Sequence, residues 1–242
     1  SFELLEELEK AERYIFLEYF ILQEGECWNA ILDILERKAA AGVEVRVFYD
    51  DMGSIGFVDT AFAKKLQQRG IQCRVFNPIV PVLNVFMNNR DHRKITVIDG
   101  QVGYTGGYNL ADEYFNLTHP YGRWKDSGVR LEGDAVRNLT LIFLEMWGTT
   151  QKEMPAIEPY LPAIRYTARE AATVLPYADN PLDDKRVGED VYLNLINSAQ
   201  RYVYITTPYL ILSDEMQRAL VLAAQRGVDV RIITPGIPDK KL

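Results

Sequence analysis

The sequence predicts an α/β fold in which helices cover both faces of a mixed, mainly parallel sheet. Two observations lead to this prediction: amphipathic helical patterns alternate with short apolar strands over residues 2–76, and part of this order returns near the end of the chain. A composition of 48% apolar and 25% charged residues is typical of a globular protein. It excludes a wholly disordered, collagen-like or coiled-coil chain.

Helices and strands alternate from the N-terminus. Residues 2–12 carry apolar side chains at helical spacing and predict a short helix, and residues 14–22 are aromatic and β-branched, as in a buried strand. The next elements are expected to be helices over 28–39 and 58–69 and strands over 43–49 and 73–76. A β-α-β-α-β order implies parallel strands with helices on the sheet faces.

Part of this pattern recurs along the chain. Residues 11–16 (AERYIF) resemble residues 199–204 (AQRYVY), and residues 42–47 (GVEVRV) resemble residues 227–232 (GVDVRI). The two offsets are 188 and 185 positions, nearly constant across two strands and the helix between them. We infer a duplicated α/β unit, although any two βαβ units can share an apolar G-V-x-V pattern.

Three segments are therefore expected. Residues 1–151 form the first unit, residues 152–186 form a connector that holds five of the eleven prolines, and residues 187–242 form the start of an incomplete second unit. The second copy breaks off after its second strand. A start at Ser1, without methionine and already in a helical pattern, suggests that the sequence has been trimmed upstream.

Charge and residue usage exclude several classes of function. A formal net charge of −7 argues against binding of long nucleic acid, and no segment approaches the roughly 20 apolar residues that cross a bilayer. Cys27 and Cys73 are the only cysteines, and His92 and His119 are the only histidines. We therefore expect no disulfide framework and no metal site, with both cysteines in the core.

One segment concentrates side chains that suit phosphate chemistry. His92 and Lys94 lie two positions apart at the start of a strand-like stretch, so both are expected to project to the same face. An ammonium group binds phosphate oxygens, while a neutral imidazole can attack phosphorus. On spacing alone, an exposed strand with solvated histidine and lysine is the alternative.

A hairpin returns the chain to this pair. Asp99-Gly100 predicts a tight turn, and residues 102–105 form the return strand. Gly106 and Gly107 follow, where backbone N–H groups could approach an anion closely, and Asn109 could donate from its amide.

These residues resemble a known family. The pattern His92-x-Lys94-x4-Asp99, followed by Gly106-Gly107-Tyr108-Asn109, resembles the H-x-K-x4-D motif of the phospholipase D superfamily, with Gly107 where that family commonly has serine. The neighbouring segments resemble bacterial cardiolipin synthases in particular: residues 17–20, 89–94, 112–114, 124–126 and 130–133. The resemblance implies a phospholipase D-like α-β-α sandwich, duplicated, with the second copy truncated.

The resemblance also implies a two-step transfer without metal or cofactor. One histidine attacks the phosphodiester phosphorus and forms a phosphohistidine, and a second protonates the leaving alcohol and then deprotonates the acceptor. For a cardiolipin synthase, one phosphatidylglycerol receives the phosphatidyl group of another, and glycerol leaves. A phospholipase D-type hydrolase or nuclease, and a non-catalytic phosphate-binding module, are the alternatives.

The family needs two such motifs, from a duplicated chain or from a homodimer. By the repeat offset, the second histidine would lie about 185 positions after His92, beyond Leu242. We therefore expect a soluble fragment with little activity alone. The full-length protein is expected to work at the cell membrane, with an anchor upstream of Ser1.

The resemblance assigns roles to individual residues. His92 and Lys94 form the catalytic pair with Asp99, although Asp99 lies at the hairpin turn and is expected to support the motif structurally. Phosphate-binding residues are expected to be Asn109, Gly106 and Gly107. Asp126 is expected to orient the imidazole of His92, with a surface aspartate as the alternative.

Three further features lie outside the motif. Glu18 interrupts an apolar strand and is expected either near the site or in a salt bridge at the end of the sheet; its repeat counterpart is Thr206. The apolar residues 77–87 are expected to line the mouth of the site or to pack on the core. His119 lies in a predicted loop and is expected at the surface.

Overall fold

The computed structural model describes residues 2–79, 89–151, 154, 156–167 and 173–236. It divides into two compact units, Ser1–Tyr177 and Ala178–Leu242. The division falls within the segment 152–186 that was expected to be a connector. Among the described residues, no helix has the length and apolar character needed to cross a membrane.

The first unit is built on a six-stranded sheet in the order β3-β2-β1-β4-β5-β6. Its strands are β1 (Tyr14–Tyr19), β2 (Glu44–Asp50), β3 (Gln72–Phe76), β4 (Lys94–Ile98), β5 (Val102–Gly106) and β6 (Gly128–Glu132). β1, β2 and β3 are parallel to one another, whereas β4, β5 and β6 each pair antiparallel with the strand before them in the sheet. Four of the six strands, β1, β2, β3 and β5, therefore run in one direction, which confirms the mixed, mainly parallel sheet.

The connections explain this mixture of directions. Helices join β1 to β2 and β2 to β3, and such crossovers return the chain parallel to itself. β4 and β5 are instead joined by a tight turn at Asp99 and Gly100, which have positive φ angles of 54° and 66°. Ile98 pairs with Val102, so residues 99–101 form the connection, and the Gln101 N–H donates to the Ile98 carbonyl oxygen at 3.0 Å. Asp99 and Gly100 are the central residues of this turn, and positive φ at both is the geometry that Asp-Gly favours.

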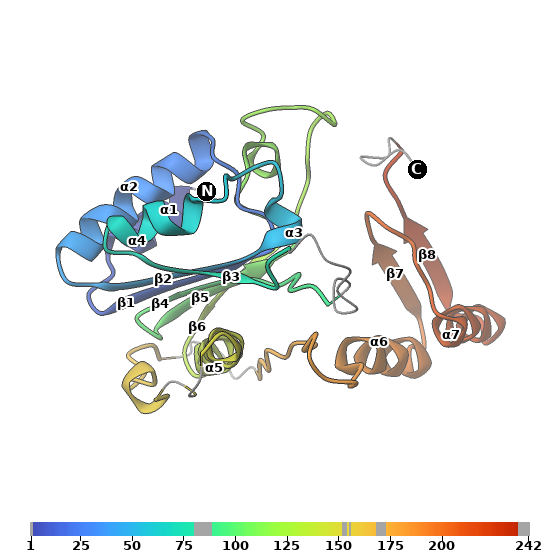
Figure 1. The fold of residues 1–242 in the computed structure, drawn as a ribbon. Helices are drawn as coiled ribbons and strands as arrows, with labels where there is room; N and C mark the ends of the chain where they lie inside the picture. The colour runs from blue at the N-terminus through green and yellow to red at the C-terminus, as the bar shows by residue number, and fades with distance from the viewer. Residues whose placement is uncertain (1, 80–88, 152–153, 155, 168–172, 237–242) are drawn as a thin grey trace. The chain divides into compact units, whose positions relative to one another are not determined.

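Helices cover both faces of this sheet (Figure 1). α1 (Phe2–Glu9), α2 (Glu26–Ala40) and α4 (Phe62–Gln68) lie on one face, and α5 (Ala135–Thr149) lies on the other. The remaining short elements are the helix α3 (Asp51–Ser54) and the 3-10 helices η2 (Asp112–Phe115) and η3 (Glu158–Tyr160). The first unit is thus an α-β-α sandwich.

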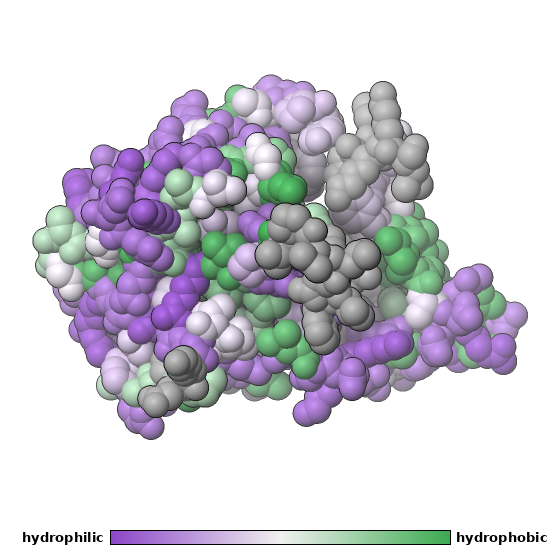
Figure 2. All heavy atoms as spheres, in the orientation of Figure 1, coloured by the Kyte–Doolittle hydropathy of each residue, from purple (hydrophilic) through white to green (hydrophobic). Residues whose placement is uncertain are grey.

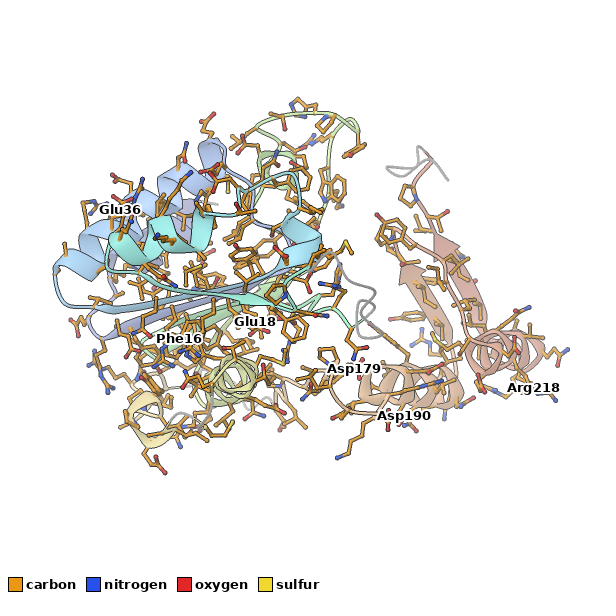
Figure 3. The ribbon with its side chains drawn as sticks, viewed as in Figure 1. Phe16, Glu18, Glu36, Asp179, Asp190 and Arg218 are labelled. Carbon is orange, nitrogen blue, oxygen red and sulfur yellow. The ribbon has the colours of Figure 1, made fainter. Side chains whose placement is uncertain are left out.

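The side chains of β1 alternate between the two cores. Leu17 and Tyr19 pack in the core beneath α1, α2 and α4, whereas Tyr14 and Phe16 pack with α5. Glu18 follows the same alternation and lies on the α5 side, further along the strand than Phe16 (Figure 3). β1 ends at Tyr19, three residues earlier than the strand expected over residues 14–22.

The second unit consists of α6 (Val187–Ser198), β7 (Tyr202–Thr206), α7 (Asp214–Gln225) and β8 (Asp229–Ile233). β7 and β8 are parallel, with Tyr202 opposite Asp229. The equivalent pair in the first unit, by the repeat offsets, is Tyr14 opposite Glu44. The two copies therefore share one strand register, not only a sequence pattern.

The copies differ in how their sheets are covered. Tyr14 and Phe16 are buried, but their counterparts Tyr202 and Tyr204 are 59% and 54% exposed. Further exposed apolar side chains belong to the loop after β7 and to β8, and Figure 2 shows green apolar surface over this region. They are Leu210, Ile211, Ile232 and Ile233.

Candidate active site

Lys94 is the first residue of β4, and His92 precedes the strand by two residues. The expectation that both side chains project from one strand is therefore corrected, because His92 lies outside the ladder. The two side chains nevertheless meet: Lys94 Nζ lies 3.1 Å from His92 Nδ1 and also donates to the carbonyl oxygen of His92. Lys94 is buried and His92 is exposed, so a basic group lies beneath an accessible imidazole.

Phe20 packs against both members of this pair, although no role in the site was predicted for it from the sequence. Its ring centroid lies 4.6 Å from that of His92 and 5.4 Å from Lys94 Nζ, within the range of a cation–π contact. Gly53 makes this packing possible, because a Cβ there would lie 2.2 Å from the carbonyl oxygen of Phe20. Only the three-dimensional fold brings Phe20 beside the motif.

Burial changes the acidity of Lys94. Removal from water lowers the pKa of Lys94 to about 8, against the attraction of Asp91, Asp126 and Asp50. At neutral pH the amine is still mostly protonated and donates to His92 Nδ1. The proton of a neutral imidazole then belongs on Nε2.

The return strand brings Asn109 close to the end of β1. Asn109 is buried, and its Oδ1 accepts a hydrogen bond of 2.9 Å from the backbone N–H of Ile21. The carbonyl end of the amide is thereby used, and only the NH2 end can donate to an anion.

Gly106 and Gly107 are held against the segment that leads into β6. A Cβ at Gly106 would lie 2.4 Å from the carbonyl oxygen of Ser127, and one at Gly107 would lie 2.4 Å from Asp126 Oδ1. The backbone N–H of Gly107 donates to the carbonyl oxygen of Ser127 at 3.1 Å. These glycines provide room for residues 126–128, and the Gly107 N–H is not directed at an anion.

Asp126 is positioned by its own segment. Its carboxylate accepts from Trp124 Nε1 at 3.0 Å and from the backbone N–H of Ser127 at 2.7 Å. Its negative charge also acts on Lys94. The role expected for Asp126 in orienting His92 stays a prediction.

Asp99 lies at the opposite end of β4 from His92. Its carboxylate accepts three backbone hydrogen bonds of 2.8 Å, from Glu12, Arg13 and Tyr14. These bonds hold the β4–β5 hairpin against the start of β1. Asp99 therefore lies at the other end of the strands from His92, and the structure does not bring the two together.

Glu18 lies beside the motif but on the other side of the sheet from Lys94. It is fully buried, and its Oε1 lies 2.9 Å from Arg93 Nε. Tyr19 pairs with Lys94 in the ladder and shares its face, so its neighbour Glu18 faces the α5 side. Glu18 contacts the residue between His92 and Lys94.

The other candidate residues have simpler environments. Cys27 and Cys73 are buried as expected, and burial raises the pKa of both thiols to about 12. His119 is exposed. No cluster of three or more histidine, cysteine or acidic side chains that could hold a metal occurs among the described residues. Val82, Leu83 and Phe86, expected at the mouth of the site, lie outside the described part of the chain.

A hollow of about 760 Å³ opens beside the edge strand β6. Aromatic and basic side chains line it, including Tyr108, Trp124, Arg123 and Lys125. Asp126 belongs to its wall, but His92 and Lys94 do not. The hollow therefore adjoins the site only through Asp126.

Comparison with known proteins relates this geometry to a family. The family model described as "Cardiolipin synthase, PLD-like domain" matches residues 4–147 and 192–242. A cardiolipin synthase of Alkalihalophilus pseudofirmus is 37% identical over 241 residues, which are 99% of this chain and 48% of that protein. An uncharacterized protein of Streptococcus mutans is 52% identical over 240 residues, 99% of this chain and 52% of its own length. The chain thus spans about half the length of the curated relatives it matches.

A solved structure agrees with the fold. Phosphatidylserine synthase from Haemophilus influenzae superposes with a TM-score of 0.66 at 15% identity, over 96% of this chain and 58% of that one. At this identity the likeness concerns the fold, and it confirms the predicted phospholipase D-like sandwich. With a family model that matches most of its length, in two segments that correspond to the two copies of the repeat, the chain belongs to the cardiolipin synthase family of phospholipase D-like domains.

Proposed function

We propose that this chain supplies one catalytic half of an enzyme that transfers a phosphatidyl group between two phosphatidylglycerol molecules, giving cardiolipin and glycerol. One observation carries the proposal: a buried lysine amine lies 3.1 Å from the imidazole of an exposed histidine, within a motif of the phospholipase D-like family. The names of the relatives support the substrate class.

In the first step, His92 attacks phosphorus. We assign the attack to Nε2, the ring nitrogen that does not face Lys94 in this structure. Nε2 must then hold a lone pair, so the ring proton has to lie on Nδ1 and Lys94 has to turn from Nδ1 to the phosphate oxygens. Asp126, whose charge already acts on Lys94, is the carboxylate proposed to accept the Nδ1 proton.

The bonds and protons balance over two steps. A phosphorus–nitrogen bond forms at His92 while the phosphorus–oxygen bond to glycerol breaks, and a second histidine protonates the departing alkoxide. That histidine then takes the proton of the acceptor hydroxyl, which attacks phosphorus and releases His92. Lys94, with the NH2 of Asn109, would stabilise the charge on the phosphoryl oxygens in both steps.

The second histidine has to come from another copy of the motif. The sequence contains one H-x-K-x4-D pattern, and His119 is an exposed loop residue. The shared register of β1–β2 and β7–β8 supports residues 187–242 as the start of a second catalytic unit, after a first unit of residues 1–151 and a connector of 152–186. A homodimer partner is the other source. We infer that residues 1–242 alone turn over phosphatidylglycerol slowly or not at all.

We further propose that the complete enzyme works at the cell membrane, where both phosphatidylglycerol molecules are found, and that it needs no cofactor. The relatives named as cardiolipin synthases support this setting.

A phosphodiester with a p-nitrophenolate leaving group tests the proposal on this chain. This leaving group needs no proton, so the first step can proceed without the second histidine. We expect a burst of about one equivalent of p-nitrophenolate per protein, followed by slow turnover. His92→Ala should abolish the burst and His119→Ala should not. A burst that survives His92→Ala would overturn the assignment.

A further inference from the structure

A cluster of buried charges lies on the opposite side of the motif from Lys94. Glu18 and Asp91 are 0% and 1% exposed, and the side chain of Arg93 is 13% exposed. Arg93 Nε lies 2.9 Å from Glu18 Oε1 and 2.9 Å from Asp91 Oδ1. Two carboxyl groups therefore share one guanidinium group inside the protein.

The alternation of the extended chain explains this placement. Lys94 pairs with Tyr19, which packs in the core beneath α1, α2 and α4. Residues one position away point to the other side, where Glu18 lies on β1 and Arg93 precedes β4. The residues on either side of His92 are thus anchored in the protein interior, while His92 itself is exposed.

A second ion pair holds the same segment from β2. Asp50, the last residue of β2, accepts the backbone N–H of Asp91 at 2.9 Å and lies 3.3 Å from Arg90 Nη1. Arg90 also donates to the carbonyl oxygen of Asn77 at 3.1 Å. Residues 90, 91 and 93 are consequently bound to β1, β2 and the end of β3.

The charges of the inner cluster do not balance if both acids are ionised. Glu18, Asp91 and Arg93 would then carry a net charge of −1 in a buried site, which is costly. Burial, and next the charge of Asp91, hold the pKa of Glu18 well above its ordinary value, although Arg93 opposes this. The charge of Glu145 on α5, which is exposed, also acts on Arg93.

We propose that Glu18, Asp91 and Arg93 are positioning residues that hold His92 in place for its attack, and that Glu18 serves as a neutral, hydrogen-bonding acid within this cluster. The inference rests on the proposed function of His92. The cluster is not repeated in the second unit, where the exposed Thr206 occupies the position of Glu18.

Replacing Glu18 by glutamine and by alanine separates the two parts of this proposal. Glutamine keeps the size and the hydrogen-bond donor of a neutral acid, so Glu18→Gln should retain the rate of the p-nitrophenolate burst within about threefold. Glu18→Ala leaves Arg93 and Asp91 without their partner and should slow the burst by about tenfold or more, with little change in the substrate concentration that gives half the maximal rate.

A second measurement does not depend on catalysis. The chain has only two histidines, so His119→Ala identifies the imidazole NMR signals of His92. Glu18→Ala should shift or broaden these signals, and Glu18→Gln should leave them close to those of the unsubstituted protein. Thr140→Val is the matched control, because it removes a buried hydrogen bond within α5, to the carbonyl oxygen of Val136, away from the cluster.

The possible results distinguish the claims. Equal losses in the alanine and glutamine variants would overturn the neutral role of Glu18. Unchanged burst and signals in Glu18→Ala would overturn the positioning role. Failure of the unsubstituted protein to show any burst would instead refute the function proposed for His92, and the NMR signals would still test the positioning.

Discussion

Replacing Gly107 by alanine tests how closely the end of β5 packs against Asp126. A Cβ at Gly107 would lie 2.4 Å from Asp126 Oδ1 and 3.2 Å from Asp126 Cγ. Non-bonded carbon and oxygen atoms rarely approach within about 3.3 Å, so the carboxylate has to move by roughly 1 Å. This shift would weaken its hydrogen bonds to Trp124 and Ser127. We expect the free energy of unfolding to fall by about 1–3 kcal/mol.

Urea unfolding of a double-mutant cycle measures this contact. In the background of Asp126→Ala the obstructing carboxylate is absent, so Gly107→Ala should cost less than about 0.5 kcal/mol. Gly236→Ala is the control, because a Cβ there meets no atom of the described residues within 4 Å. The reasoning would be refuted if Gly107→Ala cost the same with and without Asp126. Serine, common at this position in the superfamily, would meet the same carboxylate.

Three further predictions follow from individual contacts. Because the pKa of Lys94 falls to about 8 on folding, the unfolded chain binds this proton more tightly than the folded chain does. The free energy of unfolding should therefore rise by about 3 kcal/mol between pH 8 and 10.5, and Lys94→Met should abolish this rise. Urea unfolding midpoints measured across this pH range check the prediction. Asp99→Ala leaves three backbone N–H groups without their acceptor and should lower the free energy of unfolding, measured in urea, by about 2–4 kcal/mol. The p-nitrophenolate burst of the folded protein should persist, and its loss with folding intact would contradict the structural role of Asp99. Phe16→Ala should lower the free energy of unfolding by about 3–5 kcal/mol, because Phe16 is buried. Tyr204 is the exposed repeat counterpart of Phe16, and Tyr204→Ala should lower it by less than about 1 kcal/mol. Comparable losses of stability in thermal unfolding would contradict this difference in burial.

Periodicity and turn chemistry predicted much of this fold. Helical spacing and β-branched runs identified α1, α2 and α4 and the strands β1, β2 and β3, and Asp99-Gly100 predicted the hairpin of β4 and β5. The helix α5 and the edge strand β6 were not among the predicted elements. The ends of the predicted elements shifted by a few residues, as for the strand that ends at Tyr19, because tertiary contacts decide where a ladder stops. The antiparallel pairing of β1 with β4 could not be predicted, since it depends on which edge of the sheet a distant strand joins.

The candidate site was predicted only in part. The two-residue spacing predicted that the side chains of His92 and Lys94 lie close together, and the resemblance to the family predicted the roles of the motif residues. Strand length could have separated Asp99 from them, because a five-residue strand spans about 16 Å. No role in the site was predicted for Phe20, Asp50, Asp91 or Arg93, because only the folded structure shows what their side chains contact.

The central claim is that His92 carries the phosphatidyl group, and mapping the covalent adduct tests it most directly. After reaction with the p-nitrophenyl phosphodiester, phosphorus NMR and peptide mass spectrometry should locate one acid-labile phosphoramidate, on Nε2 of His92. An adduct on Nδ1 would contradict the assignment of the attacking nitrogen. An adduct on another residue, or release of p-nitrophenolate with no adduct, would contradict the account as a whole.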